Sequence, residues 1–348
     1  MALVAAGVLA VAGITGLAVR GAAADPVLPP LTPAELLGRV AAAQVDGLSA
    51  TFEQRSDLGL PALPADLGDA GDDLTSALAL LTGNHTVRVW TAGEDKAKVA
   101  LVDGRTESSL TRNGSDVWAW SSTKQEAVHS TFDAQKTKPS GTPTSPSEAI
   151  KAMLEKVEPS TEVATSGTGY VAGRAVYQLV LTPRDEASLV NQVRVSVDAE
   201  RFVPLGLRII AEDGQDAITI AASSVDYTVP AASVFDFQPP AGVTVTEHKD
   251  GSGPAKAGGE VGGQPKTFGS GWATVAVMDL PEAAKAANQA EGDEQAKVLL
   301  ESLPVVSETW GKGRLLSTVL VNAVITDDGR VAVGSVVPEK LYEALAAK

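Results

Sequence analysis

Three histidines and the absence of cysteine restrict the chemistry that this 348-residue chain could perform. His85, His129 and His248 stand singly and not at the spacing of a metal site. The Gly-Ser-Gly segment at 269–271 lacks the spacing of a nucleophile elbow and has no histidine nearby to act as its base. Without cysteine there is no disulfide, no thiolate metal ligand and no thiol nucleophile. We therefore expect a protein that is not an enzyme and that carries no metal and no cofactor.

Phosphates and nucleic acids are not expected ligands either. The segment 167–173 resembles a dinucleotide-binding loop, but its third glycine comes one residue late and no helix follows, so we interpret it as a turn. The formal net charge of −15 leaves no basic face for nucleic acid. Acidic residues at 69–73 lack the spacing of an EF-hand and are expected to form a solvated loop.

The first 24 residues predict export from the cytoplasm. Residues 2–19 are uncharged and apolar, and small residues at 21–24 precede Asp25, which is typical of a secretory signal cut after Ala24. A retained membrane anchor is the alternative, because a stretch of about 18 apolar residues lies at the lower edge of the spanning range. We expect a protein of the cell envelope or the extracellular space. Whether residues 2–19 are cut off or anchor it to the plasma membrane is left open.

Two helices are expected, each followed by a series of strands. Thr32, Pro33 and Glu35 form a capping box with proline at the first helical position. A second box at 145–148 opens a helix whose apolar residues recur at helical spacing. Between and after these helices, turn residues and period-two alternation predict eleven strands: 49–57, 86–92, 96–103, 107–112, 116–121, 126–132, 162–170, 175–183, 190–198, 203–211 and 217–227. A change of parity in the last strand predicts a bulge near 221–224.

This order of elements indicates a mainly β (α+β) fold. Consecutive hairpins favour an antiparallel sheet, and so many strands are expected to curl into an incomplete barrel whose concave face is covered by the helices. Residues 248–268 are rich in Gly, Pro and Lys and are interpreted as a linker. Beyond it, 269–348 predicts a small β-α-β-β-α unit, with strands at 271–278, 314–326 and 330–336 and helices at 281–303 and from Pro338.

An apolar cavity inside such a barrel would suit an acyl chain. Strand alternation makes four aliphatic residues candidates for its lining, and three tryptophans are added to them: Leu179, Leu181, Val195 and Leu207, with Trp90, Trp118 and Trp120. Ordinary core packing is the competing explanation for the tryptophan pair at i and i+2.

Three segments carry a resemblance to a known family: Ser-Asp-Leu-Gly-Leu-Pro-Ala-Leu-Pro at 56–64, Asp-Val-Trp-Ala-Trp-Ser-Ser at 116–122 and Phe-Asp-Phe-Gln-Pro-Pro-Ala-Gly at 235–242. With them, 31–247 resembles the actinobacterial branch of the LolA-like outer-membrane lipoprotein carriers, a superfamily that includes sensor domains controlling anti-sigma factors. The resemblance implies a half-barrel with a helical lid, an apolar cavity for acyl chains and no catalysis. It carries over no functional residue, and proteobacterial carriers lack the extension at 269–348.

Two functions of different classes are therefore carried forward. The first is an extracytoplasmic carrier or binder of lipid or lipoprotein acyl chains, with a lipid or an acylated lipoprotein as partner. The alternative is an envelope sensor or regulatory module that controls a membrane-bound partner protein, with the extension as the partner surface. An exported hydrolase is disfavoured because no nucleophile–base pair is evident.

Overall fold

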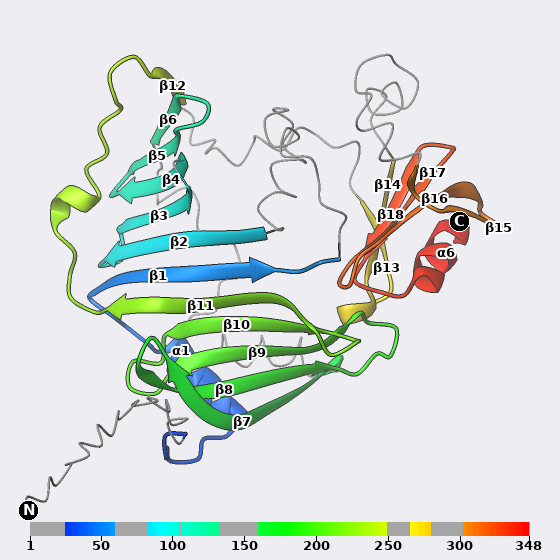
Figure 1. The fold of residues 1–348 in the computed structure, drawn as a ribbon, viewed down its shortest axis with the longest axis horizontal. Coiled ribbons are helices and arrows are strands. Elements are labelled where there is room, and N and C mark those ends of the chain that lie inside the picture. The colour runs from blue at the N-terminus through cyan, green and yellow to red at the C-terminus, as the bar shows by residue number, and fades with distance from the viewer. Residues whose placement is uncertain are drawn as a thin grey trace, which may run out of the picture.

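Two β-sheets organise the chain (Figure 1). The computed structural model describes residues 25–59, 83–104, 106–131, 159–248, 265–279 and 302–347. Within them the large sheet has 12 strands in the order β12-β6-β5-β4-β3-β2-β1-β11-β10-β9-β8-β7. The strands are β1 (Gly47–Ser56), β2 (Gly83–Ala92), β3 (Lys96–Asp103), β4 (Thr106–Asn113), β5 (Asp116–Ser121), β6 (Glu126–Thr131), β7 (Thr161–Val171), β8 (Arg174–Pro183), β9 (Val190–Asp198), β10 (Pro204–Ala211), β11 (Asp216–Asp226) and β12 (Thr244–His248).

The eleven strands expected from the sequence are all present, and the fold is mainly β as predicted. Glycine marks the tight turns, since Gly104 and Gly114 adopt positive φ of 54° and 65° between β3, β4 and β5. The expected bulge is also present: Thr51 pairs with Ser224 and Phe52 with Ala222, which leaves one residue of β11 unpaired. The register of β1 against β11 therefore agrees with the parity change read from the sequence.

The large sheet is not closed into a barrel. Its outer strands, β12 and β7, lie at opposite ends of the strand order and far apart in Figure 1. β12 was not predicted, and it differs from the other strands because it pairs in parallel with β6. An unclosed sheet leaves its faces accessible wherever no other element covers them.

Helix α1 (Pro33–Ala41) begins with the predicted capping box, in which the Glu35 backbone N–H donates to Thr32 Oγ1 at 3.2 Å and the Thr32 backbone N–H donates to Glu35 Oε2 at 2.8 Å. The fully buried Leu36 packs against Tyr177 and Leu179 on β8 and Val197 on β9. The second predicted covering helix, from 145 onward, lies outside the described residues, as do the signal segment 1–24 and most of the linker. Coverage of the sheet by both helices stays a prediction.

The C-terminal unit differs from the predicted β-α-β-β-α order. Its described part is a six-stranded sheet, β13-β14-β18-β17-β16-β15, packed against helix α6 (Pro338–Ala346). The strands are β13 (Lys266–Phe268), β14 (Val275–Asp279), β15 (Val305–Glu308), β16 (Gly311–Ser317), β17 (Asn322–Thr326) and β18 (Arg330–Gly334). A 3-10 turn at Gly271–Ala273 joins β13 to β14, and another at Ala232–Val234 lies between β11 and β12.

The predicted single strand at 314–326 is wrong, because it folds back on itself as β16 and β17. The Thr318 hydroxyl accepts from the Leu320 and Val321 backbone N–H groups, and this side-chain turn reverses a segment with no glycine or proline to signal it. Most of the helix predicted at 281–303 lies outside the described residues, which resume at residue 302.

The two sheets contact each other at one end of the large sheet. The Leu189 N–H donates to the Ser335 carbonyl at 3.0 Å, and the Trp272 indole N–H donates to Thr161 Oγ1 at 2.7 Å. Leu320 of the C-terminal unit packs with buried Val190 and Ala217 of the large sheet. The unit is thus docked by both apolar and polar contacts, while the predicted domain boundaries at 247 and 269 stay predictions.

Candidate binding faces of the large sheet

The strand register divides the side chains of the large sheet between two faces. Partners across neighbouring strands point to the same side, and successive residues of one strand point to opposite sides. Leu207 pairs with Ile220, Ile220 with Gln54, and Gln54 with His85. Trp90 follows His85 by five positions on the same regular strand, so it lies on the other face. The predicted lining residues therefore do not all share one surface.

We name the first side the helix face, because Leu179 on it contacts Leu36 of α1. The four aliphatic candidates lie there: Leu179 pairs with Val195 and Val195 with Leu207, while Leu181 is two positions from Leu179. On the other half of the sheet an unbroken aliphatic row crosses six strands, each member pairing with the next: Ala50, Val89, Val99, Leu110, Ala119 and Val128. The polar members of this face on β1 and β2 are Gln54, Ser56, His85 and Thr91.

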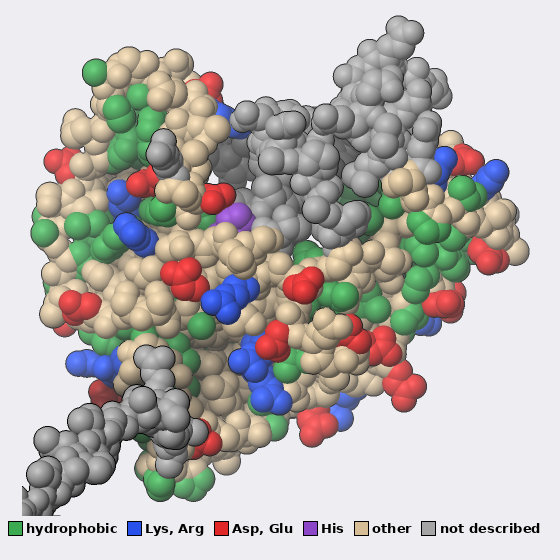
Figure 2. Space-filling model, in the orientation of Figure 1, with side chains coloured by type: hydrophobic (Ala, Val, Ile, Leu, Met, Phe, Trp, Pro, Cys, Tyr) green, Lys and Arg blue, Asp and Glu red, His purple; other side chains and the backbone are tan. Residues whose placement is uncertain are grey.

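The helix face is sealed at one end and open at the other. Leu179, under α1, is buried, whereas Val99 and Leu110 are 42% and 46% exposed. These two residues are direct partners on β3 and β4, so their exposed surfaces adjoin. Hydrophobic side chains reach the surface over the β4–β6 end of the sheet at the upper left of Figure 2. Val99 and Leu110 are thus the part of the aliphatic row that is most exposed to solvent.

The opposite side, which we name the tryptophan face, carries Trp90, Trp118 and Trp120. Trp118 stacks on His129 with ring centroids 4.3 Å apart, and Phe237 packs against both Trp118 and Trp120, at 5.3 and 6.1 Å. The segment after β11 thus supplies a cover for two of the three indoles. For these residues the packing explanation has direct contacts in its favour. The lipid-binding role predicted for all seven residues stays a prediction, and the helix face brings only four of them together.

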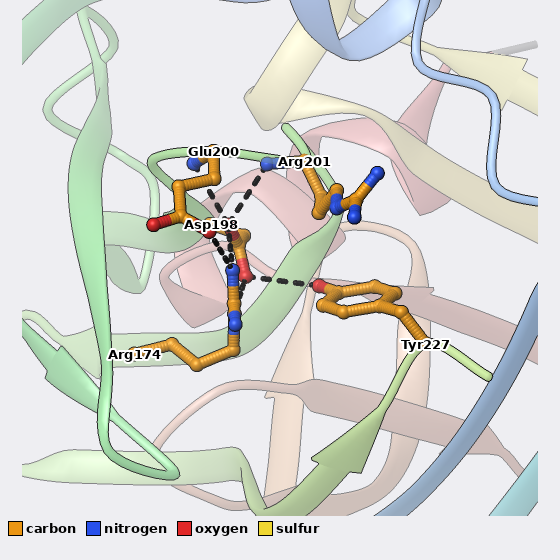
Figure 3. A network of polar contacts seen from close by, with 5 residues as sticks. All are labelled: Arg174, Asp198, Glu200, Arg201 and Tyr227. Carbon is orange, nitrogen blue, oxygen red and sulfur yellow. Dashed lines mark hydrogen bonds and ion pairs between the residues drawn. The ribbon is translucent and has the colours of Figure 1, made fainter.

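One polar network was missed by sequence reasoning (Figure 3). The buried Asp198 carboxylate accepts from the Arg174 guanidinium, from the Tyr227 hydroxyl at 2.9 Å, and from the backbone N–H groups of Glu200 and Arg201 at 2.8 and 2.9 Å. Arg174 also pairs with Glu200 at 2.8 Å. The network joins β8, the β9–β10 turn and the exit of β11.

The charges of this network are held by burial and hydrogen bonding together. Burial raises the pKa of Asp198, but the bonds from Arg174, the two backbone N–H groups and Tyr227 outweigh it, so the pKa lies below its ordinary value. Burial first, and then the bond to Asp198, raises the pKa of the Tyr227 phenol. The ionised carboxylate accepts from two backbone N–H groups of the β9–β10 turn and thereby fixes that turn, which is a structural role.

Two searches of the described residues concern ligands and membranes. In that part of the chain no group of three or more His, Asp or Glu residues is arranged to hold a metal ion. None of the helices described there combines the length and the apolar character needed to cross a membrane.

No family model and no curated protein matches the chain. Among solved structures, the MucA/MucB complex of Pseudomonas aeruginosa is similar over 90% of this chain and 96% of that chain, with 14% identity and a TM-score of 0.47. A LolA superfamily protein from Nitrosomonas europaea is similar over 60% and 99% of the two chains, with 11% identity and a TM-score of 0.25. A domain of an outer membrane lipoprotein-sorting protein from Vibrio parahaemolyticus is similar over 58% and 95%, with 13% identity and a TM-score of 0.25.

LolA superfamily proteins are thus among the structures to which this chain is similar, in agreement with the resemblance found in its sequence. The actinobacterial branch stays a prediction. Identities and scores of this size say nothing about ligands, so the functional case rests on the geometry of the chain itself.

Proposed function

We propose that this chain is a non-catalytic, extracytoplasmic binder of acyl chains, carried by lipids or by acylated lipoproteins, and that the helix face receives the acyl chain. The observation that supports this proposal is the aliphatic row from Ala50 to Val128, of which Val99 and Leu110 are exposed to solvent. Removing such surface from water is favourable in proportion to its apolar area.

The dimensions of the row suit an extended acyl chain. Neighbouring strands lie about 4.8 Å apart, so a row across six strands is roughly 24 Å long. Its members carry no hydrogen-bonding side chain, so they would discriminate against polar ligands and impose little requirement on acyl structure. α1 closes the far end of the same face. An acyl chain would therefore enter from the β3–β4 side.

Export is part of the proposal and depends on residues 1–24, whose apolar stretch and small-residue end are typical of a signal segment. The absence of a catalytic role is likewise proposed from the chemistry of the sequence. In the structure His129, one of the three histidines, faces two carboxylates and an indole, an arrangement that offers no nucleophile.

The test is acyl binding by the delipidated full chain. Native mass spectrometry with palmitate, a diacylated peptide and a triacylated peptide should show stoichiometric complexes with at least one of these ligands. The same peptides without acyl groups are the control and should not bind. Failure of every acylated ligand would overturn the proposal.

A second candidate is a regulatory module that binds a protein partner, and one observation favours it. β15 is an outer strand of the six-stranded sheet, and its Val305 is 55% exposed. Outer strands accept an extended segment of another protein by strand addition. In that case Val305→Pro would abolish partner binding and leave acyl binding unchanged, whereas loss of acyl binding alone would speak against the module.

A further inference from the structure

His129 lies between two carboxylates that come from different strands. Its Nδ1 is 2.8 Å from Glu247 Oε2 on β12, and its Nε2 is 3.1 Å from Asp116 Oδ1 on β5. The ring stacks on Trp118 at an interplanar angle of 15°, and the His129 side chain is mostly buried. Both ring nitrogens are therefore engaged with acceptors at hydrogen-bond distance.

Only the imidazolium form satisfies this geometry. A neutral imidazole has one N–H, so it donates to one carboxylate and turns a lone pair toward the other. Partial burial alone would lower the pKa of His129, but the hydrogen bonds and charges of Glu247 and Asp116 outweigh it and raise the pKa above its ordinary value.

The neighbouring elements contribute no further charge to the ring. Asp116 on β5 and Glu247 on β12 are the charged groups that face His129 among the described residues. On the stacked side, Trp118 is followed along the row by Thr111 of β4, which is uncharged. The segment after β11 contributes Phe237 to Trp118, and its Asp236 accepts a hydrogen bond from Gln238.

β12 depends on this contact more than a central strand would. It is five residues long, it pairs with β6 alone among the described strands, and Val245 within it is 43% exposed. Its register places Glu247 directly beside His129 on β6. A five-residue outer strand has a short backbone ladder and buries little apolar surface, so one side-chain contact is a larger fraction of its interactions than in a central strand. β12 is also the last described strand before the C-terminal unit begins at β13.

We propose that His129, Asp116 and Glu247 form a pH-sensitive clasp that holds β12 on β6. While the ring is doubly protonated, β5, β6 and β12 are joined through it. When one nitrogen loses its proton, one carboxylate faces a lone pair, and β12 loosens from β6. The clasp is independent of what the helix face binds.

The sign of the pH dependence follows from the raised pKa. The stabilisation of β12 is fully present below the ordinary histidine pKa of about 6.5, and it is lost as the pH rises through the higher pKa of the clasped ring. By linkage, the opening equilibrium of β12 increases tenfold for each unit by which the clasped pKa exceeds the open one.

The test combines two measurements on the full chain. NMR titration of the His129 ring gives its pKa, and hydrogen exchange gives the protection of the β12 amides, corrected for intrinsic rates, between pH 5 and 9. Wild type should show a His129 pKa above about 6.5. Its β12 protection should fall by the factor that the difference in His129 pKa between wild type and Glu247→Gln dictates, because that variant keeps the contact to Asp116 and lacks the ion pair to β12. Glu247→Gln, a change at a half-exposed side chain, should lower the His129 pKa and remove the pH-dependent loss of β12 protection. His85→Gln, the control, should keep both.

A His129 pKa at or below about 6.5 would overturn the proposal, since the clasp then gives no preference for the charged ring. The proposal would also be overturned if β12 protection stayed constant between pH 5 and 9, or if the loss of protection were equally large in Glu247→Gln and wild type.

Discussion

Replacing Asp198 by Asn should destabilise the large sheet by about 3 kcal/mol, the lower end of what breaking a buried ion pair costs. The carboxylate is fully buried, and Oδ2 accepts from both Arg174 Nε and the Tyr227 hydroxyl. An asparagine that keeps its oxygen at the Oδ1 position retains the bonds from the Glu200 and Arg201 backbone. Its amide N–H₂ then meets the Arg174 N–H, so two donors face each other where an ion pair stood.

Urea unfolding followed by circular dichroism measures this loss. With an m-value of about 3 kcal/mol/M, the midpoint should fall by roughly 1 M. Asp216→Asn is the matched control, because the Arg208–Asp216 pair is 3.5 Å long and half-exposed on both sides. Exposed pairs contribute about 0.5 kcal/mol, so the control should move the midpoint little.

The pH dependence supplies a second check. Because the pKa of Asp198 is lowered in the folded state, its stabilisation is present above the ordinary aspartate pKa and is lost as the pH falls through the folded value. The difference in urea midpoint between wild type and Asp198→Asn should therefore become smaller from pH 5 to pH 3. Equal midpoint shifts in Asp198→Asn and Asp216→Asn would refute the reasoning, and so would a difference between wild type and Asp198→Asn that does not change with pH.

Three further substitutions test packing and helix propensity. Leu36→Ala should lower the free energy of unfolding by about 2–5 kcal/mol, because the fully buried side chain leaves a cavity between α1 and β8; a urea midpoint equal to wild type would contradict this. Gly47→Ala should destabilise by about 1–3 kcal/mol, since its Cβ would meet Val229 Cα at 2.4 Å. Gly38→Ala, which meets nothing within 4 Å inside α1, should instead raise thermal stability slightly.

The strands were predictable because local signals fix them. β3, β5 and β9 have the boundaries expected from the sequence, since turn residues bound them and alternation marks their faces. β12 was missed for the opposite reason. Its five residues follow a Pro- and Gly-rich segment, and its pairing with β6 joins Glu247 to a residue 118 positions earlier.

The candidate site was predictable only in part. Alternation relates Leu179 to Leu181 within a strand, but it cannot relate Leu207 to Trp90, which depends on the pairing of β10, β11, β1 and β2. The Asp198 network likewise joins residues of three elements that are distant in sequence. Interactions of this kind arise from register, and a single sequence carries no local signal of it.

The most direct test of acyl binding on the helix face compares two substitutions of matched exposure. Leu110 is 46% exposed on the helix face, and Val245 is 43% exposed on β12, where it pairs with Ala127 on the tryptophan face. Palmitate affinity of delipidated protein should fall at least tenfold in Leu110→Asp, about 1.4 kcal/mol, because the carboxylate interrupts the aliphatic row. Val245→Asp should bind as wild type does. Unchanged affinity in Leu110→Asp, or an equal loss in both variants, would contradict binding on this face.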